Sequence, residues 1–301
     1  MRIAGAVLAA ALVTGCAKQG AKQEAATVDP QVARLIPHDA IGMAVVEMEK
    51  VRNSGLYRKY AAALPELDRA VAAAGFDPRK DITRLVIATD GNRMVAVARG
   101  NFDRDKLAET IAGMGATKSE SDGWVLFTRG GRTAGFPSPT LAVAASTEGV
   151  KAAMARAKEN AGLPAHLEKL ARGVPSGAAM WGVHWGAVTL NLPRSSNLAN
   201  LDKLLASMET VTAWANLGDG VEFTIAGETA GEEAARKLQS QIKGIIGLGR
   251  LTTPDDQPEL LRLYDGIEVR VEGKRVVTRG AASSGQIGQL MPLARRFVPQ
   301  R

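Results

Sequence analysis

An order of strand-like and helix-like segments occurs twice in this sequence, and this repeat limits the possible folds more than any other feature. In the first half the predicted elements are strands at 41–48, 82–89, 93–99, 124–129 and 140–145, with helices beginning near 54, 103 and 147. In the second half they are strands at 178–185, 211–217, 221–226, 267–271 and 275–281, with helices near 197, 229 and 287–297. Corresponding elements are displaced by roughly 130 residues, which indicates a duplicated architecture.

Each half reads β, α, β, β, α, β, β, α. The first six elements resemble the ferredoxin-like βαββαβ unit, in which helices cover one face of a mostly antiparallel sheet. The sequence therefore predicts an α+β protein of two tandem ferredoxin-like units, 31–165 and 166–301, each extended by a strand and a helix. With 46% hydrophobic residues the chain can bury a core of this size.

Local signals make three further predictions. Asp90-Gly91 between two strand-like runs predicts a tight hairpin turn, because glycine tolerates the positive φ such turns need. Thr229 and Glu232 have the spacing of a capping box at the start of a helix. The Gly- and Pro-rich segment 130–139 predicts a loop.

The N-terminus has the pattern of an export signal. Arg2 supplies a positive charge, and residues 3–13 form an apolar run. That run is shorter than the ~20 residues a membrane-spanning helix needs, but within the roughly 7–15 of a signal peptide. We therefore predict a cleaved signal peptide at 1–15.

Val13-Thr14-Gly15-Cys16 resembles the lipobox of bacterial lipoproteins. The resemblance implies that Cys16 carries a lipid, that Val13, Thr14 and Gly15 are read by the signal peptidase, and that the mature chain begins at Cys16. Residues 16–30 then form a flexible tether. Ala17, where an Asp often retains such proteins at the inner membrane, favours the outer membrane. The alternative is an ordinary secretory peptide followed by an unrelated cysteine.

The segment Leu35–Ala40 resembles the entry to the first strand in duplicated bacterial envelope proteins of unknown function. That resemblance brings no functional residues with it. Cys16 is also the only cysteine, so the folded part is predicted to lack disulfides and cysteine chemistry.

The chain is basic, with a formal charge of +7 and a pI near 9.6. Its basic residues are dispersed, and the densest clusters, Arg129 with Arg132 and Arg295 with Arg296 and Arg301, have no aromatic platform beside them. We therefore predict no nucleic-acid partner, and at most a weak attraction to anionic lipid headgroups.

The search for chemistry gives no catalytic, metal or cofactor residues. His38, His166 and His184 lack metal-ligand spacing, and no nucleophile-elbow or phosphate-loop motif occurs. Asp255, Asp256 and Glu259 form an acidic cluster without the pattern of a calcium loop.

Trp181 and Trp185 alternate with Val183 on one face of a predicted strand. Core packing is one interpretation. The other is a speculative ligand groove at the seam between the halves, lined by Trp181, Trp185 and Trp214.

These observations predict a lipid-anchored, periplasm-facing protein of the cell envelope that binds or scaffolds an envelope partner without catalysis. Two alternatives remain: a carrier of an apolar small molecule in a groove between the repeats, and an exported enzyme with a dispersed active site. A carrier should have an apolar cavity, an enzyme convergent titratable groups, and a scaffold an exposed apolar patch.

Overall fold

The structure, a computed structural model, describes residues 24–61, 77–113, 115–187 and 206–295. The predicted signal peptide, Cys16 and the start of the helix predicted near Asn197 lie outside these residues. Among the residues described, no helix is long and apolar enough to cross a membrane.

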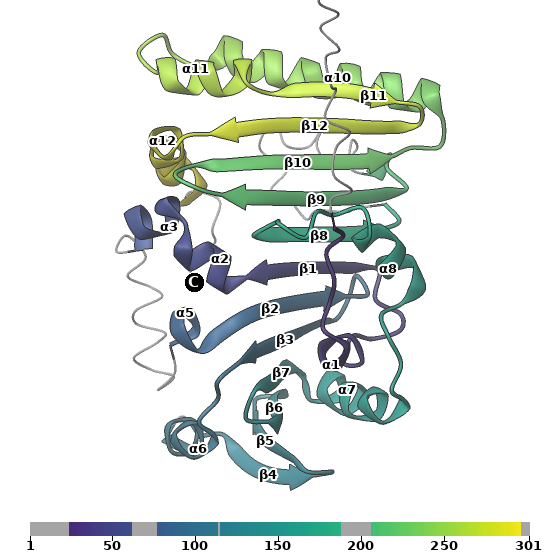
Figure 1. Ribbon diagram of the computed structural model, residues 1–301, viewed down its shortest axis with the longest axis vertical. Helices are drawn as coiled ribbons and strands as arrows, with labels where there is room; N and C mark the ends of the chain where they lie inside the picture. Colours follow the sequence, from purple (N-terminus) through teal and green to yellow (C-terminus); the bar gives the residue numbers. More distant parts are fainter. Residues whose placement is uncertain (1–23, 62–76, 114, 188–205, 296–301) are drawn as a thin grey trace, which may run out of the picture.

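One antiparallel sheet of 12 strands runs the length of the molecule (Figure 1). Up to α8, the elements in chain order are α1 (Pro30–Ala33), β1 (Gly42–Glu47), α2 (Met48–Asn53), α3 (Gly55–Tyr60), α5 (Pro78–Asp81), β2 (Ile82–Thr89), β3 (Met94–Gly100), α6 (Arg104–Gly113), β4 (Thr117–Ser121), β5 (Trp124–Arg129), β6 (Arg132–Ser138), β7 (Leu141–Ser146), α7 (Thr147–Glu159) and α8 (Ala165–Ala171). The remainder are β8 (Met180–Trp185), β9 (Thr210–Leu217), β10 (Val221–Glu228), α10 (Glu232–Thr252), α11 (Pro258–Asp265), β11 (Glu268–Glu272), β12 (Arg275–Ala282) and α12 (Ser284–Arg295).

The two halves join through β1 and β8, which pair antiparallel from Gly42 opposite His184 to Val46 opposite Met180. Outward from this junction the order is β1-β2-β3-β7-β6 on one side and β8-β9-β10-β12-β11 on the other, so both halves repeat one arrangement. Among the described residues, strands β5 and β4 extend the first half and have no counterpart in the second. The predicted boundary between residues 165 and 166 falls at the start of α8, and the sheet continues through both halves.

The α+β class and the mostly antiparallel sheet are confirmed, whereas the ferredoxin-like packing is not. In a split βαβ unit another strand separates the two strands that a helix connects. Here β1 lies directly beside β2 and antiparallel to it, and its other edge pairs with β8. The order of elements along the chain does not determine which edges pair, so sequence order alone could not give this topology.

Two strands were missed in the first half. The segment predicted as a loop contains β6, whose ladder with β7 shifts register between Gly135 and Ser138. Pro137 lies within this irregularity, where its missing N–H costs no regular ladder bond. Strand β4 is polar and fully exposed, so it carries no apolar alternation that could reveal it.

The sheet has a different set of helices on each face. Helices α1, α7 and α8 pack on one face over the largest core cluster, which includes Val45, Val97 and Val143. By strand register, α6 and α10 lie on the opposite face, each over a smaller apolar cluster. Helix α3 connects the halves further, because Leu56 N–H donates to the Gly218 carbonyl at 2.8 Å.

The capping box predicted for α10 is wrong. The N-cap residue is Gly231, and it makes no side-chain capping bond. Thr229 is instead completely buried, and its hydroxyl lies 2.9 Å from the carbonyl oxygens of both Gly231 and Lys274. Its side chain therefore connects β10 to the β11–β12 turn rather than capping the helix.

The last part of the predicted tether is held against the folded chain. Ala26 N–H donates to the Val174 carbonyl and Ser176 N–H donates to the Glu24 carbonyl, both at 2.8 Å. Asp29 then caps α1 by accepting a hydrogen bond from Gln31 N–H. The described part of the tether, 24–29, is therefore attached to the folded part.

Candidate functional site: a groove beneath helix α6

A floor of alanines lies on the sheet face covered by α6. Ala96 of β3, Ala144 of β7 and Ala134 of β6 are direct cross-strand neighbours, and Ala98 pairs with Ala142 in the next row. The opposite face of the same strands carries Val95, Val97, Leu141 and Val143, which are buried in the main core. Small side chains on one face only leave space between the sheet and α6.

Aromatic and aliphatic side chains line one end of that space. Phe102 and Phe127 each meet the ring of Phe136 edge to face, at centroid distances of 5.7 and 5.9 Å. Leu107 of α6 packs in the same cluster. The apolar end is a cavity of about 230 Å³, and its lining residues are Ile82, Leu85, Ala96, Ala98, Phe102, Leu107, Ala134, Phe136, Ala142, Val143 and Ala144.

A wider cavity of about 780 Å³ continues from the alanine floor toward the β5–β6 hairpin. The two cavities share Ala96, Ala134 and Ala144, so we treat them as one groove, the α6 groove. The wider end is lined by Asn92, Arg93, Met94, Ala96, Ile111, Ala116, Phe127, Arg129, Arg132, Thr133, Ala134, Ala144, Ala145 and Ser146. The groove is therefore apolar at one end and basic at the other.

Arg129 and Arg132 flank the tip of the β5–β6 hairpin. The turn between them is Gly130-Gly131, with φ of 55° and 75°, a conformation that glycine adopts without steric cost. The two arginines are direct cross-strand partners, two residues beyond the Phe127–Ala134 pair. Because side chains alternate along a strand, both guanidinium groups start from the face that carries the alanine floor.

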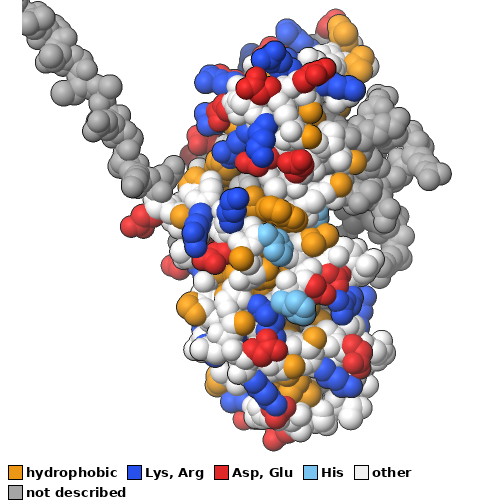
Figure 2. All heavy atoms as spheres, turned by 90° about the vertical axis from the view of Figure 1, so that its right-hand side faces the viewer, with side chains coloured by type: hydrophobic (Ala, Val, Ile, Leu, Met, Phe, Trp, Pro, Cys, Tyr) orange, Lys and Arg blue, Asp and Glu red, His pale blue; other side chains and the backbone are white. Residues whose placement is uncertain are grey.

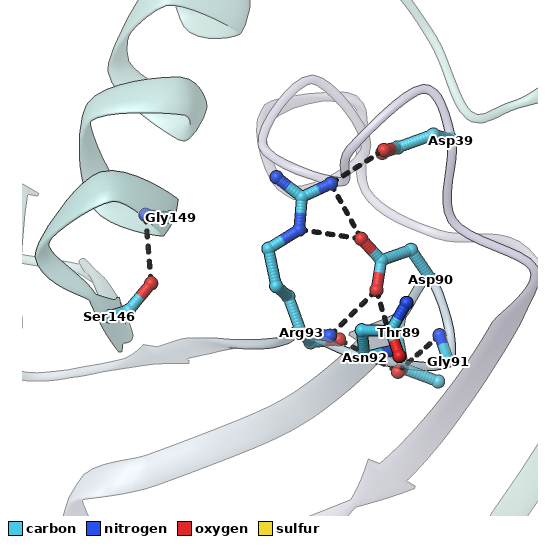
Figure 3. Close-up of polar contacts among 8 residues, drawn as sticks. All are labelled: Asp39, Thr89, Asp90, Gly91, Asn92, Arg93, Ser146 and Gly149. Carbon is cyan, nitrogen blue, oxygen red and sulfur yellow. Dashed lines mark hydrogen bonds and ion pairs between the residues drawn. The ribbon is translucent and has the colours of Figure 1, made fainter.

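The β2–β3 turn forms another part of the rim, and it confirms the predicted Asp90-Gly91 hairpin (Figure 3). Gly91 has a φ of 96°, and one Asp90 carboxylate oxygen accepts hydrogen bonds from Asn92 N–H and Arg93 N–H at 2.9 and 2.7 Å. These backbone hydrogen bonds lower the pKa of Asp90 to about 2, and the one from Arg93 N–H has the largest effect.

Arg93 is neutralised at this rim. Its guanidinium makes ion pairs with Asp90 at 2.6 Å and with Asp39 at 2.8 Å (Figure 3). Ser146, across the groove mouth, caps α7 by accepting a hydrogen bond from Gly149 N–H. Arg93 and Ser146 therefore already have partners within the protein.

The structure brings together two of the three tryptophans predicted to line a groove. Trp181 and Trp214 are cross-strand partners on β8 and β9, and Trp181 belongs to the main core. Trp185 is 43% exposed, and its ring centroid lies 5.7 Å from that of His166. None of the three lines the α6 groove, so a groove at the seam between the halves stays a prediction.

The histidines and the acidic loop lie apart from the groove lining. His166 Nε2 lies 2.7 Å from the Ala40 carbonyl oxygen, and His184 lies on β8. Within the described ranges, no group of three or more His, Cys, Asp or Glu side chains could hold a metal ion. The acidic residues with lowered pKa values, Asp29, Asp77 and Asp90, accept hydrogen bonds from backbone N–H groups and from arginines.

Charges are interspersed on the molecular face that Figure 2 shows, where basic and acidic side chains alternate around patches of hydrophobic ones. Many arginines have an acidic partner, such as Arg84 with Glu47 and Arg250 with Asp265. Many of the described basic side chains are therefore neutralised by a nearby carboxylate.

The sequence interpretation missed the α6 groove, although a signal for it was present. In the segments MVAVARG and LAVAAS, alanine alternates with valine or leucine. This pattern predicts a strand with one bulky face and one small face. The small faces of the two strands form a groove floor only because β3 and β7 are neighbours, and the sequence did not reveal that pairing.

Comparisons with known proteins give structural likeness only. No protein-family model matches the chain, and no curated protein sequence matches it significantly. The fold is similar to that of TP0453 in its crystal form III, with a TM-score of 0.55 and 11% sequence identity over 88% of this chain and 98% of TP0453. Crystal form I of TP0453 gives a TM-score of 0.53 and 12% identity over 89% of this chain and 98% of TP0453. At this identity the likeness shows the fold alone, an α+β arrangement with a large antiparallel sheet.

Proposed function

We propose that this chain is a lipid-anchored protein of the cell envelope whose folded part binds an apolar small molecule in the α6 groove without transforming it. The observation that carries the binding role is the 230 Å³ cavity lined by phenylalanine, leucine and alanine side chains. This proposal keeps the carrier function that the sequence left as an alternative. It places the binding site in the first half, whereas the sequence predicted a site at the seam between the halves.

The size of the cavity sets the expected strength of binding. A volume of 230 Å³ equals that of roughly eight molecules of liquid water, and a methylene group occupies nearly the same space. Burial of eight methylenes contributes up to about 6 kcal/mol, which corresponds to a dissociation constant of about 40 µM at the tightest. Binding of this strength is readily reversible and suits a carrier.

The anchor rests on separate observations, the apolar run at 3–13 and the pattern Val13-Thr14-Gly15-Cys16. Acyl chains on Cys16 would hold the protein at a membrane, since two or more chains give stable attachment. Ala17 supports the outer membrane over the inner one, with the folded part facing the periplasm.

Binding is tested with an uncharged fluorescent probe, N-phenyl-1-naphthylamine, and the full chain carrying Cys16→Ser. We expect saturable binding that the double variant Ala98→Leu/Ala142→Leu abolishes, because two leucines fill the apolar end. Ala281→Leu, an exposed alanine of β12, is the matched control and should bind like the parent. Equal binding by all three proteins would place the probe elsewhere and refute the site.

The anchor is tested by intact-mass analysis of protein extracted from bacterial membranes. The expected mass is that of a chain beginning at Cys16 with added acyl groups. Cys16→Ser should lose both the added mass and the membrane attachment. An unmodified, soluble parent chain would refute the anchor and leave the groove proposal intact.

Binding of a protein partner is the second candidate, and one observation supports it. On α10, Ile245, Leu248 and Leu251 recur every three residues, and their side chains are 39%, 58% and 83% exposed. A photo-crosslinking amino acid at position 251 should give one discrete adduct in the envelope if this surface binds a partner. The same label at the exposed Arg236 on α10 is the control.

A further inference from the structure

We propose that the α6 groove selects a single-chain amphiphile with an anionic head group, and that Arg129 and Arg132 bind that head group. The inference rests on the proposed function and names its ligand class. Its evidence is the placement of two arginines at the wider end of the α6 groove, whose other end is apolar.

The arginine pair is costly without an anion. Arg129 and Arg132 face each other directly across the β5–β6 hairpin, and like charges in this position destabilise a strand pair. No described acidic side chain forms an ion pair with either of them, and both are exposed to solvent. An anion between the two guanidinium groups would remove the repulsion and accept hydrogen bonds from both.

The neighbouring arginine provides a contrast. Arg93 also lines the wider end of the groove, but its guanidinium already forms ion pairs with Asp39 and Asp90. The lining of both parts of the groove contains no Asp or Glu among the described residues. An anionic head group therefore meets two available cations and no opposing carboxylate in the groove wall.

Strand β6 sets the direction of the ligand. Its alternate residues Arg132, Ala134 and Phe136 share one face, so that face changes along the strand from cationic to small to aromatic. At about 3.3 Å per residue, Arg132 and Phe136 are roughly 13 Å apart along the strand. A head group at the hairpin thus places an attached chain over the alanine floor and its end among the phenylalanines.

The cavity volume sets the chain length. An apolar end that holds roughly eight methylenes fits a chain of about eight to ten carbons. Carboxylate and phosphate head groups share the chemistry that two arginines recognise, so both a fatty acid and an alkyl phosphate belong to the proposed class.

The test measures binding of octanoate, decanoate, decyl phosphate and decanol to the full chain carrying Cys16→Ser, by displacement of N-phenyl-1-naphthylamine. The variants are Arg129→Gln/Arg132→Gln and, as control, Arg275→Gln/Arg279→Gln, which removes the same charge from β12. We expect the first variant to lose at least tenfold in affinity for all three anions and to bind decanol unchanged. The control should bind all ligands like the parent. Each added methylene should raise affinity about fourfold until the cavity is full.

A stability measurement separates recognition from a structural role. Without ligand, Arg129→Gln/Arg132→Gln should melt at the same temperature as the parent or higher, because the repulsion is gone. A lower melting temperature together with an equal loss of decanol binding would assign the arginines to folding and overturn the inference.

The outcomes distinguish this inference from the proposed function. If decanol and decanoate bind equally and the arginine variant has no effect, the groove binds apolar molecules without reading a head group, and only the inference fails. If the uncharged probe and decanol do not bind, the proposed function fails as well. Stronger binding of decyl phosphate than of decanoate assigns a phosphate head group, and the reverse order assigns a carboxylate.

Discussion

Ala142→Leu tests whether the space beneath α6 is available to a ligand. Ala142 is a half-buried residue of β7 that lines the apolar end of the groove and pairs with Ala98. The substitution adds three carbon atoms, and their burial contributes about 2.4 kcal/mol at ~0.8 kcal/mol each. Ordering the leucine side chain costs about 0.5–1 kcal/mol. Since the groove is open to solvent at one end, we expect a net gain of about 1 kcal/mol in the free energy of unfolding.

The assay is urea denaturation followed by circular dichroism, together with titration of N-phenyl-1-naphthylamine. Ala142→Leu should raise the urea midpoint and weaken probe binding at the same time. The control is Ala178→Leu just before β8, a buried alanine of the main core on the opposite face of the sheet. Ala178 lines neither part of the α6 groove, and overpacking of the core there should cost about 1–3 kcal/mol.

The two variants must differ in sign for the reasoning to hold. If Ala142→Leu destabilises the protein as much as Ala178→Leu, the space beneath α6 is filled in solution and the groove is a packing interface. A stabilised Ala142→Leu that still binds the probe would show that the probe does not enter the apolar end.

Three further predictions concern the scaffold. The pKa of Asp90 is lowered to about 2, so its contribution to stability is present above its ordinary pKa of 3.8 and is lost as the pH falls through 2. Asp90→Asn should therefore cost about 1 kcal/mol at pH 6. Urea titrations should show this difference between the variant and the parent shrinking between pH 4 and pH 2. Gly100→Ala would put its Cβ 2.0 Å from the Asp81 carbonyl oxygen, so urea denaturation should show a free energy of unfolding lower by about 1–3 kcal/mol. Gly113→Ala is the control and should change it very little, because the added carbon meets no atom within 4 Å. Leu238→Ala on the buried side of α10 should cost about 2–5 kcal/mol, and Leu251→Ala on the exposed side less than ~0.5 kcal/mol; equal thermal shifts for this pair would contradict the described orientation of α10.

The elements with apolar alternation or clear caps were predictable from the sequence. Strands β2 and β3 and helix α7 lie within a residue or two of their predicted bounds, and Asp103 caps α6 as expected, accepting hydrogen bonds from the N–H groups of Asp105 and Lys106. Each exception has its own cause. Strand β4 is polar throughout, β6 contains Pro137, and Thr229 is held by a carbonyl that is remote in sequence.

The pairing of strands was not predictable, and the groove depended on it. The sequence places Ala96 and Ala144 on separate strands with an alternating pattern, but only the β3–β7 ladder makes them neighbours. The sequence identified Arg129 and Arg132 as a dense basic cluster, but it did not show that they lie at one end of the alanine floor. Local patterns report which face a side chain occupies, and long-range pairing decides which faces meet.

The β1–β8 junction has a consequence for how such a molecule could arise. Two equivalent strands, one from each half, meet antiparallel at the centre of the sheet, as two identical subunits meet edge to edge about a two-fold axis. A chain ending after the first half would present β1 as an open edge of the same shape, ready to accept a second copy. The strand arrangement is therefore that of a symmetric dimer whose two subunits are joined in one polypeptide. Among the described residues, the first half alone carries the additional β4–β5 hairpin, whose neighbour β6 forms part of the groove floor.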